Sequence, residues 1–196
     1  MTTPYLYTAQ TKLLLQVKAD LDMDEGFREY AYPDPLSPLM KKYPFSKERR
    51  WGFVPAKEIL ANISEKLSGA PWTVGYGFTQ GVTVDSKMSK PIAERKLEVM
   101  ILEMDQELGS VLSWYQEASF VTKTVLINML HNLGLKGLLG FKNTLKYMGE
   151  KAYKNAAANM RKSLWAKQVG RRAAYLSERI ETQTIKPEHK APEKLC

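Results

Sequence analysis

The chain has 196 residues, of which 44% are hydrophobic, and these values are typical of a globular protein with a substantial core rather than a disordered one. Its 29 Lys and Arg residues against 21 acidic residues give a formal net charge of +8, which predicts attraction to an anionic polymer such as nucleic acid, cell wall or a membrane surface. The single cysteine, Cys196, excludes an internal disulfide framework. We expect no membrane insertion and no secretory signal, because no apolar run is long enough to span a bilayer and the first residues lack a basic start.

The first expected element is a helix over about residues 8–24, in which apolar residues recur at helical spacing from Leu13 to Leu21 and Gly26 follows as a C-cap. Glu25 then lies at the C-terminus of this helix, where the partial negative charge of the helix end disfavours an ionised carboxylate. A carboxyl group that keeps its proton suits an acid catalyst. A surface glutamate at a helix end is the alternative interpretation.

Asp34 lies between Pro33 and Pro35, so we expect a turn or an extended loop there rather than a helix. By itself it would be an ordinary turn residue. Its distance in sequence from Glu25 is short enough for a helix end and a turn to bring both carboxylates to one cleft. Cleavage of a glycosidic bond needs one carboxylic acid to protonate the leaving oxygen and a second carboxylate to stabilise positive charge and position water. The pair therefore indicates a glycosidase.

Residues 35–71 are interpreted as an insertion with its own fold and a short helix over about residues 55–67. Basic and aromatic residues alternate in its first half: Lys41, Lys42, Tyr43, Phe45, Lys47, Arg49, Arg50 and Trp51. Such a segment can stack on sugar rings or bases and hold anionic groups. A solvated flap whose aromatic side chains anchor it to the body is the alternative. We expect the insertion to flank the cleft and to contribute to binding through its basic residues.

Residues 73–79 alternate in the manner of a strand, with Gly75 and Gly77 on one face, where a ligand or backbone can approach closely. The segment lacks the third glycine of a dinucleotide-binding fingerprint, so we reject that interpretation. A second small strand is expected over residues 82–84, which would complete a hairpin.

The rest of the chain is expected to be helical. Helical periodicity and glycine breaks predict helices over about residues 91–112, 120–133, 141–148, 151–163 and 164–182. The first of these would span about 30 Å, enough to join two lobes. Residues 183–196 have little apolar content and are expected to be mobile. His131 lacks a Cys or His partner for a zinc site, so no metal is expected.

The motifs, taken in order and spacing, resemble the phage lysozymes of glycoside hydrolase family 24. In the first half they are Asp24-Glu25-Gly26, Asp34 and the Thr-x-Gly-x-Gly strand that starts at Thr73. In the second half they are Ile127-Asn128-Met129, Gly140-Phe141-x-Asn143-Thr144-Leu145, Ala156-Ala157-x-Asn159 and Ser163-x-Trp165. The resemblance covers roughly residues 10–182.

The resemblance implies a mainly α, α+β bilobal fold, with a small β-hairpin N-terminal lobe and a helical C-terminal lobe joined by a long helix. Residues 1–182 would form a single lysozyme-like domain. Its catalytic lobe would be residues 24–90, its helical lobe residues 91–182, and the N-terminal helix would pack on the helical lobe.

The resemblance also implies a muramidase that hydrolyses the β-1,4 bond between N-acetylmuramic acid and N-acetylglucosamine in peptidoglycan, with inversion and without a metal or organic cofactor. The resemblance implies that Glu25 is the general acid, that Asp34 stabilises developing positive charge, and that Thr73 helps to hold the nucleophilic water. Inversion requires carboxyl groups roughly 6.5 to 9.5 Å apart. By matched position, the residues that line the sugar-binding cleft would be Thr79, His131, Asn132, Thr144 and Asn159.

The implied setting is a monomeric phage endolysin, made in the host cytoplasm and dependent on a holin to reach the cell wall at lysis; a virion-borne lysozyme is the alternative.

The chain departs from the family in several places. A stretch of 38 residues separates Asp34 from Thr73, and Phe78 replaces a common histidine. His131 and Thr79 also replace more apolar residues of the best-known relative. Two other functions stay open: a lytic transglycosylase on the same fold, which Thr73 disfavours, and a non-enzymatic basic module that binds nucleic acid or a cell-wall polymer.

Overall fold

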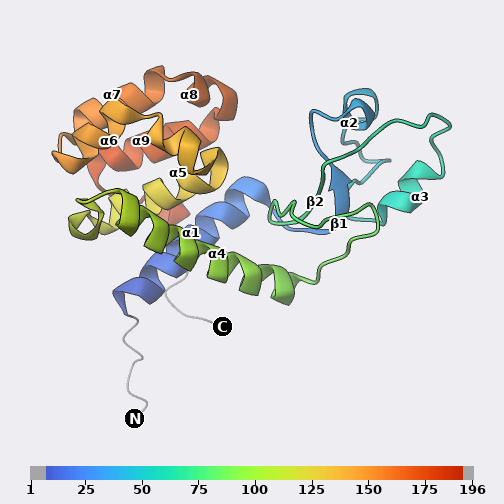
Figure 1. Cartoon of the computed structure of the whole chain (residues 1–196), viewed down its shortest axis with the longest axis horizontal. Coiled ribbons are helices and arrows are strands. Elements are labelled where there is room, and N and C mark those ends of the chain that lie inside the picture. Colours follow the sequence, from blue (N-terminus) through green and yellow to red (C-terminus); the bar gives the residue numbers. More distant parts are fainter. Residues whose placement is uncertain (1–7, 192–196) are drawn as a thin grey trace, which may run out of the picture. The chain divides into compact units, whose positions relative to one another are not determined.

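The computed structural model describes residues 8–191. These residues form two compact units, a helical unit of residues 8–24 and 98–191 and a mixed unit of residues 25–97 (Figure 1). The chain passes from one unit to the other at the end of helix α1 and within helix α4.

The helical unit is built from α-helices and two short 3-10 turns. Their bounds are α1 Ala9–Glu25, α4 Lys90–Val111, η1 Tyr115–Glu117, α5 Phe120–Leu139, α6 Lys142–Gly149, α7 Tyr153–Lys162, α8 Leu164–Val169, α9 Arg171–Thr182 and η2 Pro187–His189. Helix α7 packs against both α6 and α9, and α9 also packs on α5 (Figure 1). Their inward faces are fully buried at Ile127, Met160 and Ile180, so apolar burial at helical spacing holds this unit together.

The expected helices are confirmed, and glycines set where two of them break. Ser119 caps α5 by accepting a hydrogen bond from Thr122 N at 3.1 Å. Gly134 interrupts α5 with a φ of +67°, and Gly170 has a φ of +52°. Gly170 therefore divides the helix expected over residues 164–182 into α8 and α9, because the left-handed backbone region cannot continue an α-helix.

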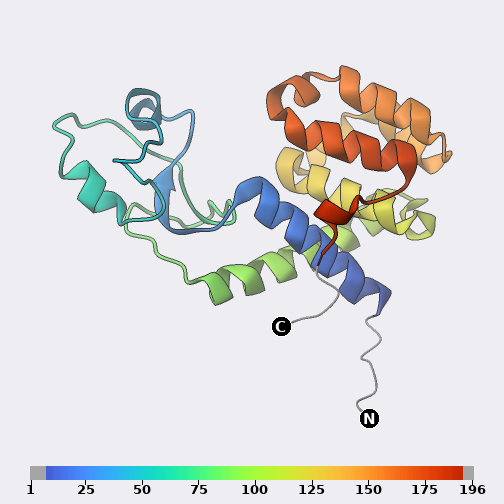
Figure 2. The ribbon, with the colours of Figure 1, turned by 180° about the vertical axis from the view of Figure 1, so that it is seen from behind.

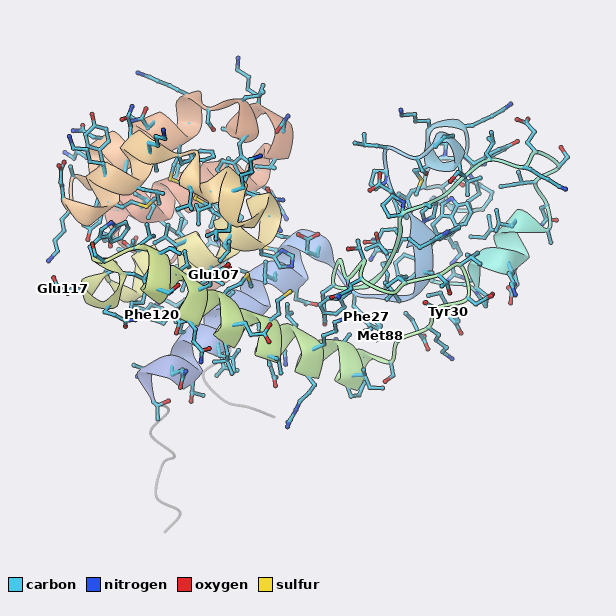
Figure 3. All side chains as sticks on the ribbon, viewed as in Figure 1. Phe27, Tyr30, Met88, Glu107, Glu117 and Phe120 are labelled. Carbon is cyan, nitrogen blue, oxygen red and sulfur yellow. The ribbon has the colours of Figure 1, made fainter. Side chains whose placement is uncertain are left out.

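The mixed unit contains a small antiparallel sheet. Among the described residues, β1 (Arg28–Pro33) and β2 (Trp72–Gly75) form its two strands, with Arg28 opposite Gly75. Short helices α2 (Pro38–Lys42) and α3 (Ala56–Leu60) lie between these strands in sequence. Labelled residues in Figure 3 that lie along this unit are Phe27, Tyr30 and Met88, and Met88 N donates to Glu29 O at 2.9 Å.

The prediction of a hairpin over residues 73–84 was wrong for its second strand. Gly75 and Gly77 both have positive φ, so the chain turns back at once and Phe78 bridges to Val74. Residues 79–86 then form turns, with Val82 N donating to Thr79 O at 3.2 Å. The partner of β2 is instead β1, a strand that was not predicted from the sequence.

The insertion of residues 35–71 has a cluster of buried apolar side chains: Leu39, Met40, Trp51, Ala56 and Ile59. The helix expected over residues 55–67 ends at Leu60. Asn62 Nδ2 donates to Glu58 O at 3.0 Å, while Asn62 N turns to Ile59 O at 3.1 Å. The amide side chain thus takes the carbonyl that an α-helix would use, and the helix tightens and ends.

The last described residues contact α1. Gln16 on α1 is buried and donates from Nε2 to His189 O at 2.6 Å, and Gln16 Oε1 accepts from Ala191 N at 3.0 Å. Figure 2 shows η2 beside α1. Residues 187–191, part of the segment expected to be mobile, are therefore hydrogen-bonded to the helical unit. Residues 192–196, which include Cys196, lie outside the described residues.

Candidate active site

Glu25 is the last residue of α1, as the sequence predicted. Gly26 follows with a φ of +63°, a conformation that glycine adopts without strain and that commonly ends helices. The Glu25 side chain is partly exposed and belongs to the mixed unit. A helix terminus therefore presents this carboxyl group at the start of that unit.

Asp24, directly before it, is held in the helical unit by three donors. Its Oδ2 atom accepts from the Tyr175 hydroxyl at 2.5 Å, Arg172 Nε at 2.8 Å and Asn128 Nδ2 at 2.9 Å. Burial and the Asp24 charge raise the pKa of the Tyr175 hydroxyl above its usual range, so it remains a donor. These bonds fix the last turn of α1, and through it the backbone that leads to Glu25. Asp24 and Asn128 both belong to the sequence motifs, but nothing in the sequence indicated that they meet in this network.

Asp34 lies directly after β1, in the turn that the flanking prolines predicted. Its Oδ1 atom accepts from Leu36 N at 2.7 Å, and its own N–H donates to Pro71 O at 3.0 Å. Within residues 8–191, the other carboxylate oxygen accepts no protein hydrogen bond. The turn therefore orients Asp34 while leaving one oxygen able to face a ligand or water.

Thr73 lies in β2 and is 7% exposed. It is opposite Tyr32 in the sheet, and Trp72 is opposite Pro33, the residue before Asp34. The 38 intervening residues thus leave the sheet after Asp34 and return at Trp72. Antiparallel pairing joins the two strands on either side of the insertion. It places Thr73 alongside the strand that leads to Asp34.

Tyr32 is a residue of this site that the sequence analysis missed. Burial raises the pKa of its hydroxyl, the negative charges of Glu25 and Asp34 raise it further, and Arg28 opposes them. The hydroxyl therefore lies within electrostatic reach of both carboxylates and stays protonated at neutral pH. Its place two residues before Asp34 in a strand, which puts side chains on one face, was the available signal.

The eight predicted site residues divide equally between the two units. Those in the mixed unit are Glu25, Asp34, Thr73 and Thr79, the last in an exposed turn. Those in the helical unit are His131, Asn132, Thr144 and Asn159. The structure thus supports two groups, each within its own unit.

Two of the four residues in the helical unit line one cavity of about 710 Å³, and a third, Asn132, is hydrogen-bonded to a residue of its lining. Thr144 and Asn159 line it together with Phe141 and Trp165. Trp165 Nε1 donates to Asn132 Oδ1 at 2.7 Å, and the rings of Phe141 and Trp165 meet edge to face at 5.8 Å. Aromatic faces beside amide and hydroxyl groups suit a sugar ring, which has both apolar and polar surfaces.

His131 precedes Asn132 on α5 and is partly buried. It is not among the residues that line this cavity. Lys142 and Lys162 are, and both are exposed, so the cavity carries positive charge at its rim. Neither lysine was recognised from the sequence, where they are single basic residues on different helices.

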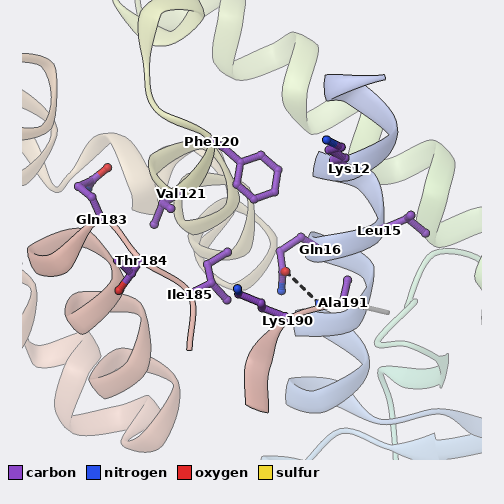
Figure 4. Close-up of a pocket in the computed structure, with 10 residues that line it drawn as sticks. All are labelled: Lys12, Leu15, Gln16, Phe120, Val121, Gln183, Thr184, Ile185, Lys190 and Ala191. Atoms are coloured by element: carbon purple, nitrogen blue, oxygen red, sulfur yellow. Dashed lines mark hydrogen bonds between the residues drawn. The ribbon is translucent and has the colours of Figure 1, made fainter. Parts of the chain in front are cut away.

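A second cavity of the helical unit, of about 600 Å³, lies elsewhere (Figure 4). Phe120, Val121 and Ile185 give it apolar walls, with Lys12 and Lys190 at its margin. None of the predicted site residues lines it. It is therefore separate from the candidate active site.

No helix in the described part of the chain has the length and apolar character needed to cross a membrane. Across residues 8–191, no group of three or more His, Cys, Asp or Glu side chains is arranged to hold a metal ion.

The mainly helical α+β architecture, with its small antiparallel sheet, is that of a lysozyme-like protein. The family model for phage lysozyme matches residues 59–183, more than half of the chain. The chain therefore belongs to the phage lysozyme family. The matched range contains Thr73 and Thr79, whereas Glu25 and Asp34 precede it.

The chain is also similar to a curated protein of Dictyostelium discoideum, Probable T4-type lysozyme 1. The two are 30% identical over 104 residues, which is 52% of this chain and 59% of the relative. The match thus spans less than two thirds of that relative.

Proposed function

We propose that this protein is a lysozyme-type glycosidase that hydrolyses the β-1,4 bond between N-acetylmuramic acid and N-acetylglucosamine in bacterial peptidoglycan. The observation that carries the proposal is the sheet register that brings Thr73 beside the strand leading to Asp34, in the same unit as Glu25. Membership of the phage lysozyme family supports the same class of reaction.

In the proposed mechanism, Glu25 donates its proton to the glycosidic oxygen as the bond to the anomeric carbon breaks. The carboxylate of Asp34 stabilises the positive charge that develops on the sugar ring. Asp34 and the Thr73 hydroxyl hold a water that attacks the anomeric carbon from the opposite face, and the water loses a proton to Asp34. The product is a reducing end of inverted configuration.

Sugar binding is proposed for both units. In the helical unit, Thr144 and Asn159 would contact a sugar in the cavity that Trp165 and Phe141 wall, with Asn132 holding the Trp165 indole. Thr79 and His131 are the two remaining proposed contacts. The net charge of +8 would draw the enzyme to the anionic bacterial envelope.

The proposed biological role is that of a monomeric phage endolysin that accumulates in the host cytoplasm, needs a holin to reach the wall, and lyses the cell. Family membership is what supports this role. Antibody labelling of a phage lysate tests it, and we expect the protein in the lysate supernatant. Recovery in purified virions would instead assign it to the particle.

The decisive experiment is turbidity clearing of purified peptidoglycan by the wild type and by Glu25→Gln, with mass spectrometry of the released ends. We expect hydrated reducing ends from the wild type and loss of clearing in the variant, because glutamine cannot donate the proton. Glu29→Gln is the matched control, since Glu29 lies on β1 and pairs with Lys87 at 3.3 Å, and it should clear normally.

Anhydro ends would contradict hydrolysis and identify a lytic transglycosylase. No clearing by the wild type would leave the basic binding module as the better explanation. Clearing by Glu25→Gln at the wild-type rate would remove Glu25 from the mechanism.

A further inference from the structure

A cavity of about 530 Å³ lies on the insertion, within residues 43–63. Val54, Ile59 and Ile63 make part of its lining apolar. Its size is in the range of cavities that hold small ligands or single ligand groups. None of the candidate site residues described above belongs to it, so the proposed reaction does not use it.

The charges of the lining are of both signs and balance. Arg49 and Arg50 provide two positive charges, and Glu48 and Glu58 provide two negative charges. A hydrogen bond from Ser46 lowers the pKa of Glu48, which therefore remains an anion. A uniformly anionic polymer would meet repulsion from the two glutamates, whereas a ligand with both a carboxylate and an ammonium group would find a partner for each.

Of the two arginines, Arg50 is the one whose guanidinium has no partner among the described residues. Arg49 donates from Nε to Pro44 O at 2.8 Å, whereas within residues 8–191 the Arg50 guanidinium has no hydrogen bond or ion pair. Lys42, another basic residue of the insertion, is already paired with Glu65 at 2.6 Å. Of the basic residues expected to bind substrate, Arg50 is thus exposed, unpaired and at a cavity.

The backbone of Arg50 is strained, with a φ of +24°. A non-glycine residue keeps such a conformation only where its surroundings impose it. Here the adjacent Trp51 is fully buried and its Nε1 donates to Tyr43 O at 3.0 Å, and Phe53 N donates to Arg50 O at 2.9 Å. A buried anchor therefore fixes the backbone of Arg50 at the edge of the cavity that this residue helps to line.

From these observations we infer that the cavity is a subsite for the short peptide attached to the glycan, a peptide that carries a free carboxylate, a free amino group and small aliphatic side chains. Arg50 binds the carboxylate, Glu48 and Glu58 bind the ammonium group, and the apolar part of the lining receives the aliphatic side chains. The inference rests on the proposed action on peptidoglycan and assigns to the insertion a role in choosing cross-link-free peptides.

The test compares two substrates, intact peptidoglycan and glycan strands freed of peptide by an amidase. We expect Arg50→Ala to raise KM on intact peptidoglycan by about tenfold, the effect of losing one charge-assisted hydrogen bond. On the peptide-free strands KM should not change. Lys154→Ala on α7 is the charge-matched control, since this exposed lysine lies outside the insertion and lines none of the cavities described, and it should leave both values unchanged.

A second variant tests whether the effect of Arg50→Ala comes from a disturbed loop rather than from the lost side chain. Arg50→Gly removes the side chain but suits a positive φ, so it keeps the loop conformation and should reproduce the effect of Arg50→Ala. Calorimetry with a free tetrapeptide that carries both charged groups measures the subsite without catalysis. We expect binding by the wild type, loss in both variants, and loss when the peptide carboxylate is amidated.

The outcomes separate the subsite from the proposed reaction. Cleavage of both substrates by the wild type with unchanged KM in both Arg50 variants overturns the subsite alone. Equal KM changes on both substrates also overturn it, because the effect would then concern the glycan. If the wild type cleaves neither substrate, the proposed reaction fails, and the calorimetry still decides whether the peptide binds at Arg50.

Discussion

The two units of this protein are stabilised in different ways. The helical unit buries charge: Asp20 on α1 accepts from Arg179 on α9 at 2.6 and 2.9 Å, and both side chains are at most 3% exposed. The mixed unit buries aromatic and apolar side chains around Trp51 and turns its chain at glycines. Its ion pairs, such as that of Lys42 with Glu65, are exposed.

This difference suits what each unit is proposed to do. The helical unit would bind sugar and holds the end of α1, and the mixed unit carries the proposed catalytic residues and the insertion. Buried ion pairs demand one arrangement of their partners, because an unpaired buried charge is costly, and they hold α1 and its end at Asp24 in place. Short strands and glycine turns allow a long insertion to be accepted between Pro33 and Trp72 without breaking the sheet. Four changes, in order of expected effect, would test the contrast.

The largest effect is expected from Asp20→Ala in the helical unit. The substitution leaves the Arg179 guanidinium buried without its bidentate partner, which should cost about 3 to 5 kcal/mol of unfolding free energy. Denaturant unfolding followed by circular dichroism measures this cost. The control is Glu181→Ala, whose exposed pair with Arg161 should contribute about 1 kcal/mol or less. Equal losses in the two variants would contradict the role assigned to burial.

Gly75→Ala should be the next most destabilising change, in the mixed unit. Gly75 has a φ of +68°, and an added Cβ would lie 2.8 Å from Phe78 Cδ2. Left-handed strain and overpacking together should cost about 2 to 4 kcal/mol. Gly81→Ala separates the two causes, because Gly81 has a similar φ of +70° but no atom within 4 Å of the added carbon. Its cost should be about 1 to 2 kcal/mol, and a cost as large as that of Gly75→Ala would exclude the contact with Phe78.

Tyr32→Phe should act on catalysis rather than on folding. The ring stays and only the hydroxyl near Glu25 and Asp34 is lost, so kcat/KM should fall by about tenfold or less with little change in stability. Tyr30→Phe on the same strand is the control and should leave kcat/KM unchanged. An unchanged kcat/KM in Tyr32→Phe would remove Tyr32 from the site.

The smallest effect concerns the exposed pair of Lys42 and Glu65. The hydrogen bond and charge of Lys42 lower the pKa of Glu65 from its usual 4.5. The stabilisation is therefore complete above that value and is lost as the pH falls through the lowered pKa. We expect Lys42→Met to lower the denaturation midpoint slightly at pH 7 and not at pH 3, with Lys41→Met as control. A difference that persists at pH 3 would require an origin other than this pair.

The sequence predicted most of what depends on near neighbours. Apolar periodicity located α1, α4 and α5, and Gly26 marked the helix end that carries Glu25. The prolines around Asp34 predicted its turn. These signals were sufficient because helix caps, glycine conformations and proline restrictions act within about one turn of the chain.

Only the tertiary structure decided which distant segments meet. The alternation of residues 73–79 indicated a strand but could not name Arg28–Pro33 as its partner, because pairing depends on a segment beyond the insertion. The anchoring of Asp24 by Tyr175, 151 residues away, was equally invisible, and so was the position of Tyr32 near two carboxylates. By itself, then, the sequence determined most of the helices, the turn at Asp34 and the candidate carboxylates Glu25 and Asp34. Strand pairing and burial, which arise only when remote side chains exclude water together, decided how the site is supported.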